Sequence, residues 1–302
     1  MSGFHASQNK PCCRKSSLSQ HNEHVLVIKA SSGWVPVDLK EVWQHRELAL
    51  MLAWREILVR YKQSVLGAAW AIVQPLATMV VFTVLFSLLL GRDNLPTTDG
   101  VPYAISTYCA LLPWQLFAQS VTRASMSIVS NQGLISKVYF PRLIIPLAPV
   151  LAALVDFGIA FVVLVGMMFW YRIVPGPAVV LLPAFVLLAV AAALGAALLL
   201  AAVNTLYRDV QHIVPFLVQL LMYLTPVIYA AESVLKNQAD WVRMVYFLNP
   251  MTGVVEGFRW ALLGATAPSP FVLTGSVAAV FALLVGSLYY FKRIERQFAD
   301  VV

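Results

Sequence analysis

Residues 178–203 read AVVLLPAFVLLAVAAALGAALLLAAV, a run of 26 residues without a charged side chain. A helix needs about 20 apolar residues to cross the hydrocarbon core of a bilayer, so this run predicts a membrane span. Five further apolar runs complete a predicted set of six spans, at residues 68–90, 101–121, 143–169, 178–203, 213–229 and 271–291. The fold class expected from this pattern is an all-α polytopic membrane protein.

The overall composition supports a membrane protein. Of the 302 residues, 60% are hydrophobic and 12% are charged, whereas a soluble domain carries about 25% charged residues. This excludes an ordinary cytosolic domain, a disordered chain and a fibrous repeat. The net charge is +7, and the basic residues gather beside the apolar runs. That placement favours anionic lipid headgroups as the contact and argues against nucleic acid.

The first 37 residues form a polar tail without the apolar region of a signal peptide, and we expect this tail to stay in the cytoplasm. Residues 25–28 predict a short strand within it. Cys12, Cys13, His21 and His24 are a conceivable zinc set, but adjacent cysteines are poorly spaced ligands, so no metal is expected.

Residues 38–67 predict an amphipathic helix that lies in the membrane interface. Asp38 and Glu41 form a capping-box pattern at its start, and its apolar residues, with Trp43 and Trp54 among them, recur at helical spacing. A soluble amphipathic helix that packs on a partner protein is the alternative reading of the same pattern.

The segment 230–270 is too polar for a confident span and too apolar for a free loop. Pro250 cannot continue a helix that needs its N–H, so Asn249–Pro250 divides the segment. Glu256 and Arg259 lie three residues apart, on one helical face. We expect two short re-entrant gate helices on the outer side, with a structured external loop as the alternative.

Orientation follows from the Lys and Arg residues near the span ends. With the N-terminus inside, ten of them flank the inner ends of the spans and five lie in the outer loops. Both termini, including the tail 292–302, are therefore expected in the cytoplasm.

Asp156 is the only formal charge well inside a predicted span. It either faces a water-filled conduit or a symmetry mate, or it bonds to a neighbouring helix and aids packing. One carboxylate cannot serve as both acid and base, and the sequence contains no GxxxxGK[ST] phosphate loop. We therefore expect no enzyme in this chain and an energy source outside it.

Six short motifs resemble the permeases of ABC-2 type exporters, in particular those that export lipid-linked O-antigen, capsule or teichoic acid. Two segments differ slightly from that pattern, because Ala110 replaces a usual glycine and Thr225 a common serine. The match runs from about residue 25 to residue 291. The motifs are Arg60–Gly67 with Trp70 and Pro75, Leu111–Trp114, Lys137–Arg142, Asn204 with Tyr207–Val210, Thr225–Tyr229, and Asn249–Pro250.

The resemblance implies a homodimer of this chain with two copies of a separate ABC ATPase, which would bind ATP and magnesium, so that this chain needs no cofactor. It implies a lipid-linked polysaccharide substrate, O-antigen first, and a multi-pass location in a bacterial inner membrane. Capsular polysaccharide, teichoic acid, or a drug or small lipid are alternative substrates. A membrane enzyme and a passive channel are competing classes that the sequence disfavours.

Candidate site residues fall into two sets. The residues expected to couple the spans to the ATPase are Arg60, Tyr61, Lys137, Tyr139, Phe140, Arg142, Arg208 and Asp209. Aromatic rings can stack on sugar faces while a chain slides past them, and this motivates the second set. The conduit and gate candidates are Phe82, Phe86, Tyr108, Trp114, Phe117, Asp156, Tyr223, Tyr229, Asn249, Glu256 and Arg259.

Overall fold

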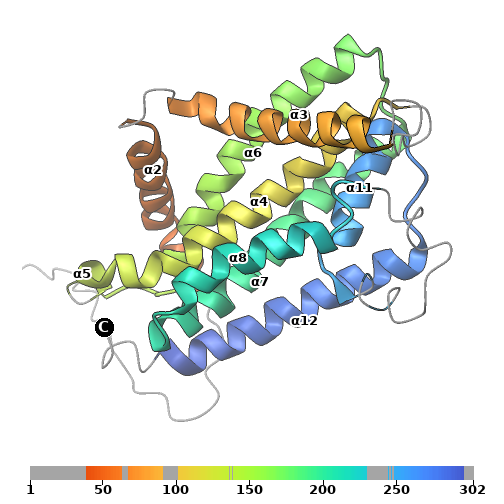
Figure 1. Cartoon of the computed structure of the whole chain (residues 1–302). Helices are drawn as coiled ribbons and strands as arrows, with labels where there is room; N and C mark the ends of the chain where they lie inside the picture. The colour runs from red at the N-terminus through yellow and green to blue at the C-terminus, as the bar shows by residue number, and fades with distance from the viewer. Residues whose placement is uncertain are drawn as a thin grey trace, which may run out of the picture. The chain divides into compact units, whose positions relative to one another are not determined.

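The computed structural model describes residues 39–62, 67–90, 101–135, 137, 139–229, 244, 246 and 248–295. These residues belong to one compact unit, Val37–Val302, built from helices (Figure 1). The predicted strand at 25–28, the four-residue zinc candidate set and most of the first gate helix lie outside the described residues.

The helices follow one another along the chain with short connections. Two helices precede the first span: α1 (Leu39–Gln44) and α2 (Arg46–Lys62). The remaining elements are η1 (Gly67–Ala69), α3 (Trp70–Leu90), α4 (Tyr103–Ser130), α5 (Gln132–Ile135), α6 (Ile144–Trp170), η3 (Pro177–Leu181), α7 (Leu182–Leu206), α8 (Val210–Leu224), α11 (Thr252–Leu263) and α12 (Pro270–Glu295).

Within the described residues, four segments are long and apolar enough to cross a membrane: Gly67–Leu89, Ile144–Trp170, Pro177–Leu206 and Pro270–Glu295. They correspond to predicted spans one, three, four and six. The helix α8 is apolar but has only 15 residues. The helix α4 is long enough, with 28 residues, but carries many polar side chains.

The position of α4 explains its polar sequence. It lies at the centre of the bundle and packs against α3, α6, α7, α8 and α11 (Figure 1). Most of its residues are buried against these helices, so its side chains meet protein instead of lipid. A hydropathy pattern therefore understates how deeply this helix lies in the fold.

The observed bounds differ most from the predicted ones at two places. The helix α4 continues to Ser130, nine residues beyond the predicted end of the second span. The helix α8 ends at Leu224, five residues before the predicted end at Tyr229. Pro226 explains the early end, because a proline disfavours helical backbone at the residue before it, and Thr225 is extended with ψ 140°.

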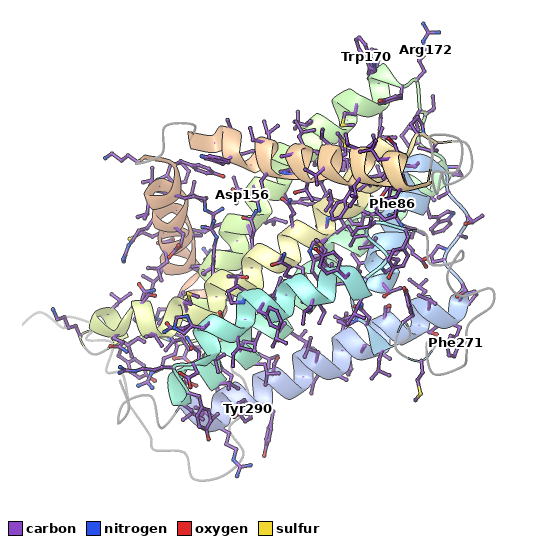
Figure 2. The ribbon with its side chains drawn as sticks, in the orientation of Figure 1. Phe86, Asp156, Trp170, Arg172, Phe271 and Tyr290 are labelled. Atoms are coloured by element: carbon purple, nitrogen blue, oxygen red, sulfur yellow. The ribbon has the colours of Figure 1, made fainter. Side chains whose placement is uncertain are left out.

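The predicted interface helix is divided at His45 into α1 and α2. The helix α2 packs on α6 and buries the small residues Ala49 and Ala53. Trp43 and Trp54 stay largely exposed, at 69% and 61%. At the far end of α6, Trp170 and Arg172 project outward (Figure 2).

The short helix α11 is buried between α4, α7 and α12. A Cβ added to Gly257 would lie 2.2 Å from the ring of Phe185, so the close approach of α11 to α7 requires glycine there. Gly264, with φ +69°, ends the helix in the left-handed conformation that glycine adopts without strain. Twelve residues span about 18 Å, which is less than the roughly 30 Å core of a bilayer.

Candidate functional site

A groove of about 470 Å³ runs between α3, α4 and α8. The helix α4 forms its floor, because it packs against both of the other helices. The residues that line the groove are Gln74, Ala77, Thr78, Val81, Phe82, Leu111, Trp114, Gln115, Ala118, Gln119, Pro215, Val218, Gln219, Met222 and Tyr223.

Amide side chains set the chemistry of this groove. Gln115 and Gln119 lie one helical turn apart on α4, Gln74 and Thr78 are spaced in the same way on α3, and Gln219 faces them from α8. Each amide offers two N–H donors and one carbonyl acceptor. The groove can therefore hydrogen-bond a hydroxyl-rich molecule in many orientations.

Three aromatic residues that were predicted as conduit candidates line the same groove: Phe82, Trp114 and Tyr223. Tyr223 is half exposed, while Trp114 packs its ring against Phe117 at a centroid distance of 5.5 Å. Rings supply flat apolar surface beside the amides. The glutamines were not among the predicted site residues, although their four-residue spacing was visible in the sequence.

Asp156 lies part-way along α6 (Figure 2) and is bound by the last residues of α2. Its carboxylate forms an ion pair with Arg60 and accepts a hydrogen bond from the Tyr61 hydroxyl. Burial, and after it the nearby positive charge of Arg123, lowers the pKa of Arg60 to about 10. Arg60 is therefore still protonated at neutral pH, and the pair is ionic.

This ion pair joins the two predicted sets of residues. Arg60 and Tyr61 were assigned to ATPase coupling and Asp156 to the conduit, and the structure brings them together across 96 residues of chain. The contact is the bond to a neighbouring helix that the packing interpretation of Asp156 expected. A sequence pattern within one helix cannot predict a partner that lies 96 residues away in the chain.

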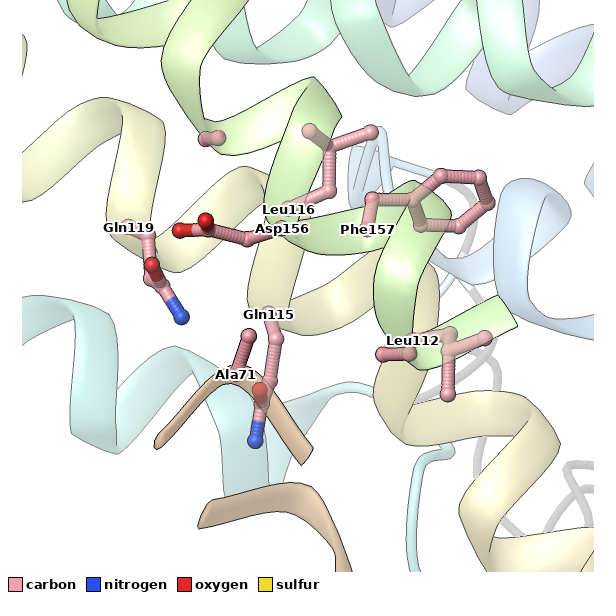
Figure 3. A pocket seen from close by; sticks show the side chains of 9 residues that line it. Ala71, Leu112, Gln115, Leu116, Gln119, Asp156 and Phe157 are labelled. Carbon is pink, nitrogen blue, oxygen red and sulfur yellow. The ribbon is translucent and has the colours of Figure 1, made fainter. Parts of the chain in front are cut away.

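A small cavity of about 10 Å³ separates the ion pair from the groove. Gln115 and Gln119 line both spaces, and the Asp156 carboxylate points toward Gln119 (Figure 3). The volume suits about one water molecule. The two glutamines thus stand between the buried charge and the groove.

Arg259 on α11 is buried, with 4% of its surface exposed. Its guanidinium donates to the carbonyls of Pro226 (2.8 Å), Tyr229 (3.0 Å) and Val227 (2.5 Å), and more weakly to that of Ser106 on α4 (3.4 Å). These bonds hold the turn that follows α8. Arg259, which was predicted as a gate residue, therefore fastens this turn, and its side chain does not line the groove.

Further hydrogen bonds fix the same turn. Asn249 donates to the hydroxyl of Thr225 at 2.9 Å, and the hydroxyls of Tyr229 and Tyr246 lie 2.5 Å apart. Tyr103 on α4 donates to the carbonyl of Ile228 at 2.8 Å. The turn 225–229 is thus bound from α4, from α11 and from the segment before α11.

The other conduit and gate candidates lie away from the groove. Tyr108 is fully buried and donates to the carbonyl of Ala160 on α6 at 3.2 Å. Phe117 is buried in the core, and the ring of Phe86 packs against Tyr103 at 5.8 Å. Glu256 is half-buried on α11. Tyr108, Phe86 and Phe117 do not line this groove and pack inside the bundle instead, as aromatic residues in a helical bundle often do.

The coupling candidates after α4 divide into buried and exposed residues. Phe140 is buried at the end of the bundle among Ile128, Ala202 and Phe291, and Arg142 donates to the carbonyl of Glu295 at 2.5 Å. Lys137 and Tyr139 are exposed. Arg208 and Asp209 are also exposed, between α7 and α8. Phe140 and Arg142 therefore anchor a connection that presents Lys137 and Tyr139 outward.

The model of the ABC-2 type transporter family matches residues 47–263 of this sequence. This match runs from the second residue of α2 to the end of α11. It includes every residue that lines the groove, the ion pair of Arg60 with Asp156, and Arg259 with the turn that it binds. The chain belongs to the ABC-2 type transporter family. The resemblance drawn from the six short motifs is thereby confirmed.

Individual relatives of this ABC-2 type transporter carry more specific names. The O-antigen export system permease protein RfbA of Myxococcus xanthus is 29% identical, over 87% of this chain and 98% of its own length. A protein of the same name from Klebsiella pneumoniae is 26% identical, over 85% and 95%. The polysialic acid transport protein KpsM of Escherichia coli is 24% identical, over 69% and 78%.

Proposed function

We propose that this ABC-2 type transporter is the permease of an ATP-driven exporter that carries a lipid-linked polysaccharide, O-antigen in the first instance, across the bacterial inner membrane. The groove between α3, α4 and α8 is the observation that carries the proposal. The glutamine amides and aromatic rings of the groove suit a glycan that must slide along the groove and must not bind tightly at one position. The names of the RfbA relatives support the same substrate class.

The groove suggests how a conduit would be completed. Its residues Gln74 and Ala77 on α3 and Gln219 on α8 are exposed. Only 11% of the residues in the apolar stretch of α3 are buried, against 44% in that of α7. A second copy of the chain on this side would close the groove and cover α3. We therefore propose a homodimer with the conduit at its seam.

In this proposal α3, α4, α6, α7, α8 and α12 are the six spans and both termini are cytoplasmic. The short helix α11 is re-entrant from the outer side, and Arg259 fixes it to the turn after α8. At the opposite end of the bundle, the exposed residues Lys137, Tyr139, Arg208 and Asp209 and the beginning of α2 would contact two copies of a separate ATPase. Closure of the ATPases would then reach α6 through Arg60 and Asp156.

A reconstitution experiment tests the proposed function. The purified chain alone is expected to show no ATP hydrolysis, and hydrolysis is expected when the partner ATPase is added. In cells that lack their own O-antigen permease, the pair should restore surface polysaccharide. Disabling the nucleotide site of the partner should abolish this export. Export that continues with the disabled ATPase would contradict the proposal.

A further inference from the structure

All fifteen residues that line the groove between α3, α4 and α8 are uncharged. The polar groups on this surface are the four glutamine amides, the hydroxyls of Thr78 and Tyr223 and the indole N–H of Trp114. Such groups can replace the water around a sugar hydroxyl. They cannot neutralise a charged sugar. In the proposed dimer, a second copy would add a second set of the same uncharged residues.

A buried carboxylate behind this surface is compensated. Asp156 lies behind Gln115 and Gln119, across the small cavity, and its carboxylate is bound by Arg60 and Tyr61. Arg60 and Asp156 together carry no net charge. This ion pair therefore contributes little electrostatic potential, positive or negative, to the groove.

We infer that the exporter selects glycans whose repeating units are uncharged and discriminates against polyanionic glycans. The inference rests on the proposed function and narrows its substrate class. A carboxylate or phosphate on each repeat would lose part of its hydration in the groove, and none of the fifteen described lining residues would give it a cationic partner. Burial of an unpaired charge is costly. Neutral hydroxyls meet amide donors and acceptors instead. The groove thus favours the chemistry of a neutral O-antigen over that of polysialic acid, which bears a carboxylate on every sugar.

The test compares two lipid-linked glycans in cells that lack their own permease and that express this chain with its partner ATPase. One glycan is a polymer of neutral hexoses and the other is polysialic acid, and surface polysaccharide is measured for each. We expect export of the neutral polymer to exceed export of polysialic acid by roughly a hundred-fold, as the cost of one unpaired charge at membrane depth implies. Comparable export of both glycans would overturn the inference.

Groove variants separate the contribution of this chain from that of the ATPase. Gln219→Lys and Gln74→Lys place a cation in the groove at side chains that are already exposed, so folding should tolerate them. Each is expected to reduce the preference for the neutral polymer at least ten-fold, whereas Gln44→Lys, the same change on exposed α1, should leave it unchanged. A preference that neither groove variant alters would overturn the inference.

Failure of the proposed function would look different. If neither glycan reaches the surface although both proteins are present in the membrane, the chain is not a polysaccharide exporter, and the inferred selectivity falls with it. If polysialic acid alone is exported, the export function stands and the inference of a neutral substrate is wrong.

Discussion

Replacing Asp156 by leucine is expected to lower the melting temperature of the purified protein by on the order of 10 °C. The substitution leaves the buried Arg60 guanidinium beside Arg123 without its counter-charge. Breaking a buried ion pair by removal of one partner costs about 3–5 kcal/mol, and this cost corresponds to several degrees or more for a chain of this size. Arg60→Met should have a similar effect, because it leaves the carboxylate unpaired.

The double variant Arg60→Met, Asp156→Leu is the informative control. Apolar replacement of both partners is often neutral or stabilising, so most of the lost melting temperature should return. Tyr61→Phe removes one hydrogen bond to the carboxylate and should cost only about 1.5–3 kcal/mol. Single variants that melt like the native protein would show that the ion pair does not stabilise the contact between α2 and α6.

The same set of variants tests the coupling role of this ion pair. If it carries motion from α2 to α6, the double variant should be stable in the membrane and yet export less polysaccharide per ATP hydrolysed. A double variant with native stability and native export would mean that the ion pair serves packing alone.

Arg259→Ala is expected to destabilise the protein to a similar extent. The substitution removes the donor from the carbonyls of Pro226, Val227 and Tyr229. A buried carbonyl without a partner costs about 1–3 kcal/mol. Melting temperature and export should therefore both fall steeply.

Two further variants serve as controls for Arg259→Ala. Arg259→Lys keeps the charge but cannot reproduce the planar fork of donors, so it should recover only part of the loss. Arg293→Ala removes an exposed arginine from α12 and should change neither measurement. Native melting temperature in Arg259→Ala would contradict the role assigned to Arg259 in holding the turn.

Helix positions were predictable from sequence where the local pattern was strong. The runs at 143–169 and 178–203 contain almost no charge, and the observed helices begin and end within a few residues of them. Hydropathy was less informative for α4, because a helix buried by protein can be polar. The early end of α8 was encoded by Pro226, which the apolar run around it obscured.

The candidate site was less predictable than the helices. Its aromatic residues were found by type, but type alone could not separate Trp114, which lines the groove, from Tyr108, which binds a backbone carbonyl inside the core. The contacts of Asp156 with Arg60 and of Arg259 with the turn after α8 depend on the tertiary fold. Arg60 and Asp156 are 96 positions apart in the sequence, and Arg259 and Tyr229 are 30 positions apart. No local spacing in the sequence encodes contacts between residues so far apart.

The central proposal, that polysaccharide passes along the groove of α3, α4 and α8, can be tested by site-specific photo-crosslinking. A photoreactive amino acid is placed at Thr78 or Gln219 in the groove, or at Phe281, which is exposed on α12. The exporter is stalled with a disabled partner ATPase while lipid-linked polysaccharide is supplied. Adducts with polysaccharide are expected at Thr78 and Gln219 and not at Phe281. Adducts at Phe281 with none at either groove position would contradict the proposal.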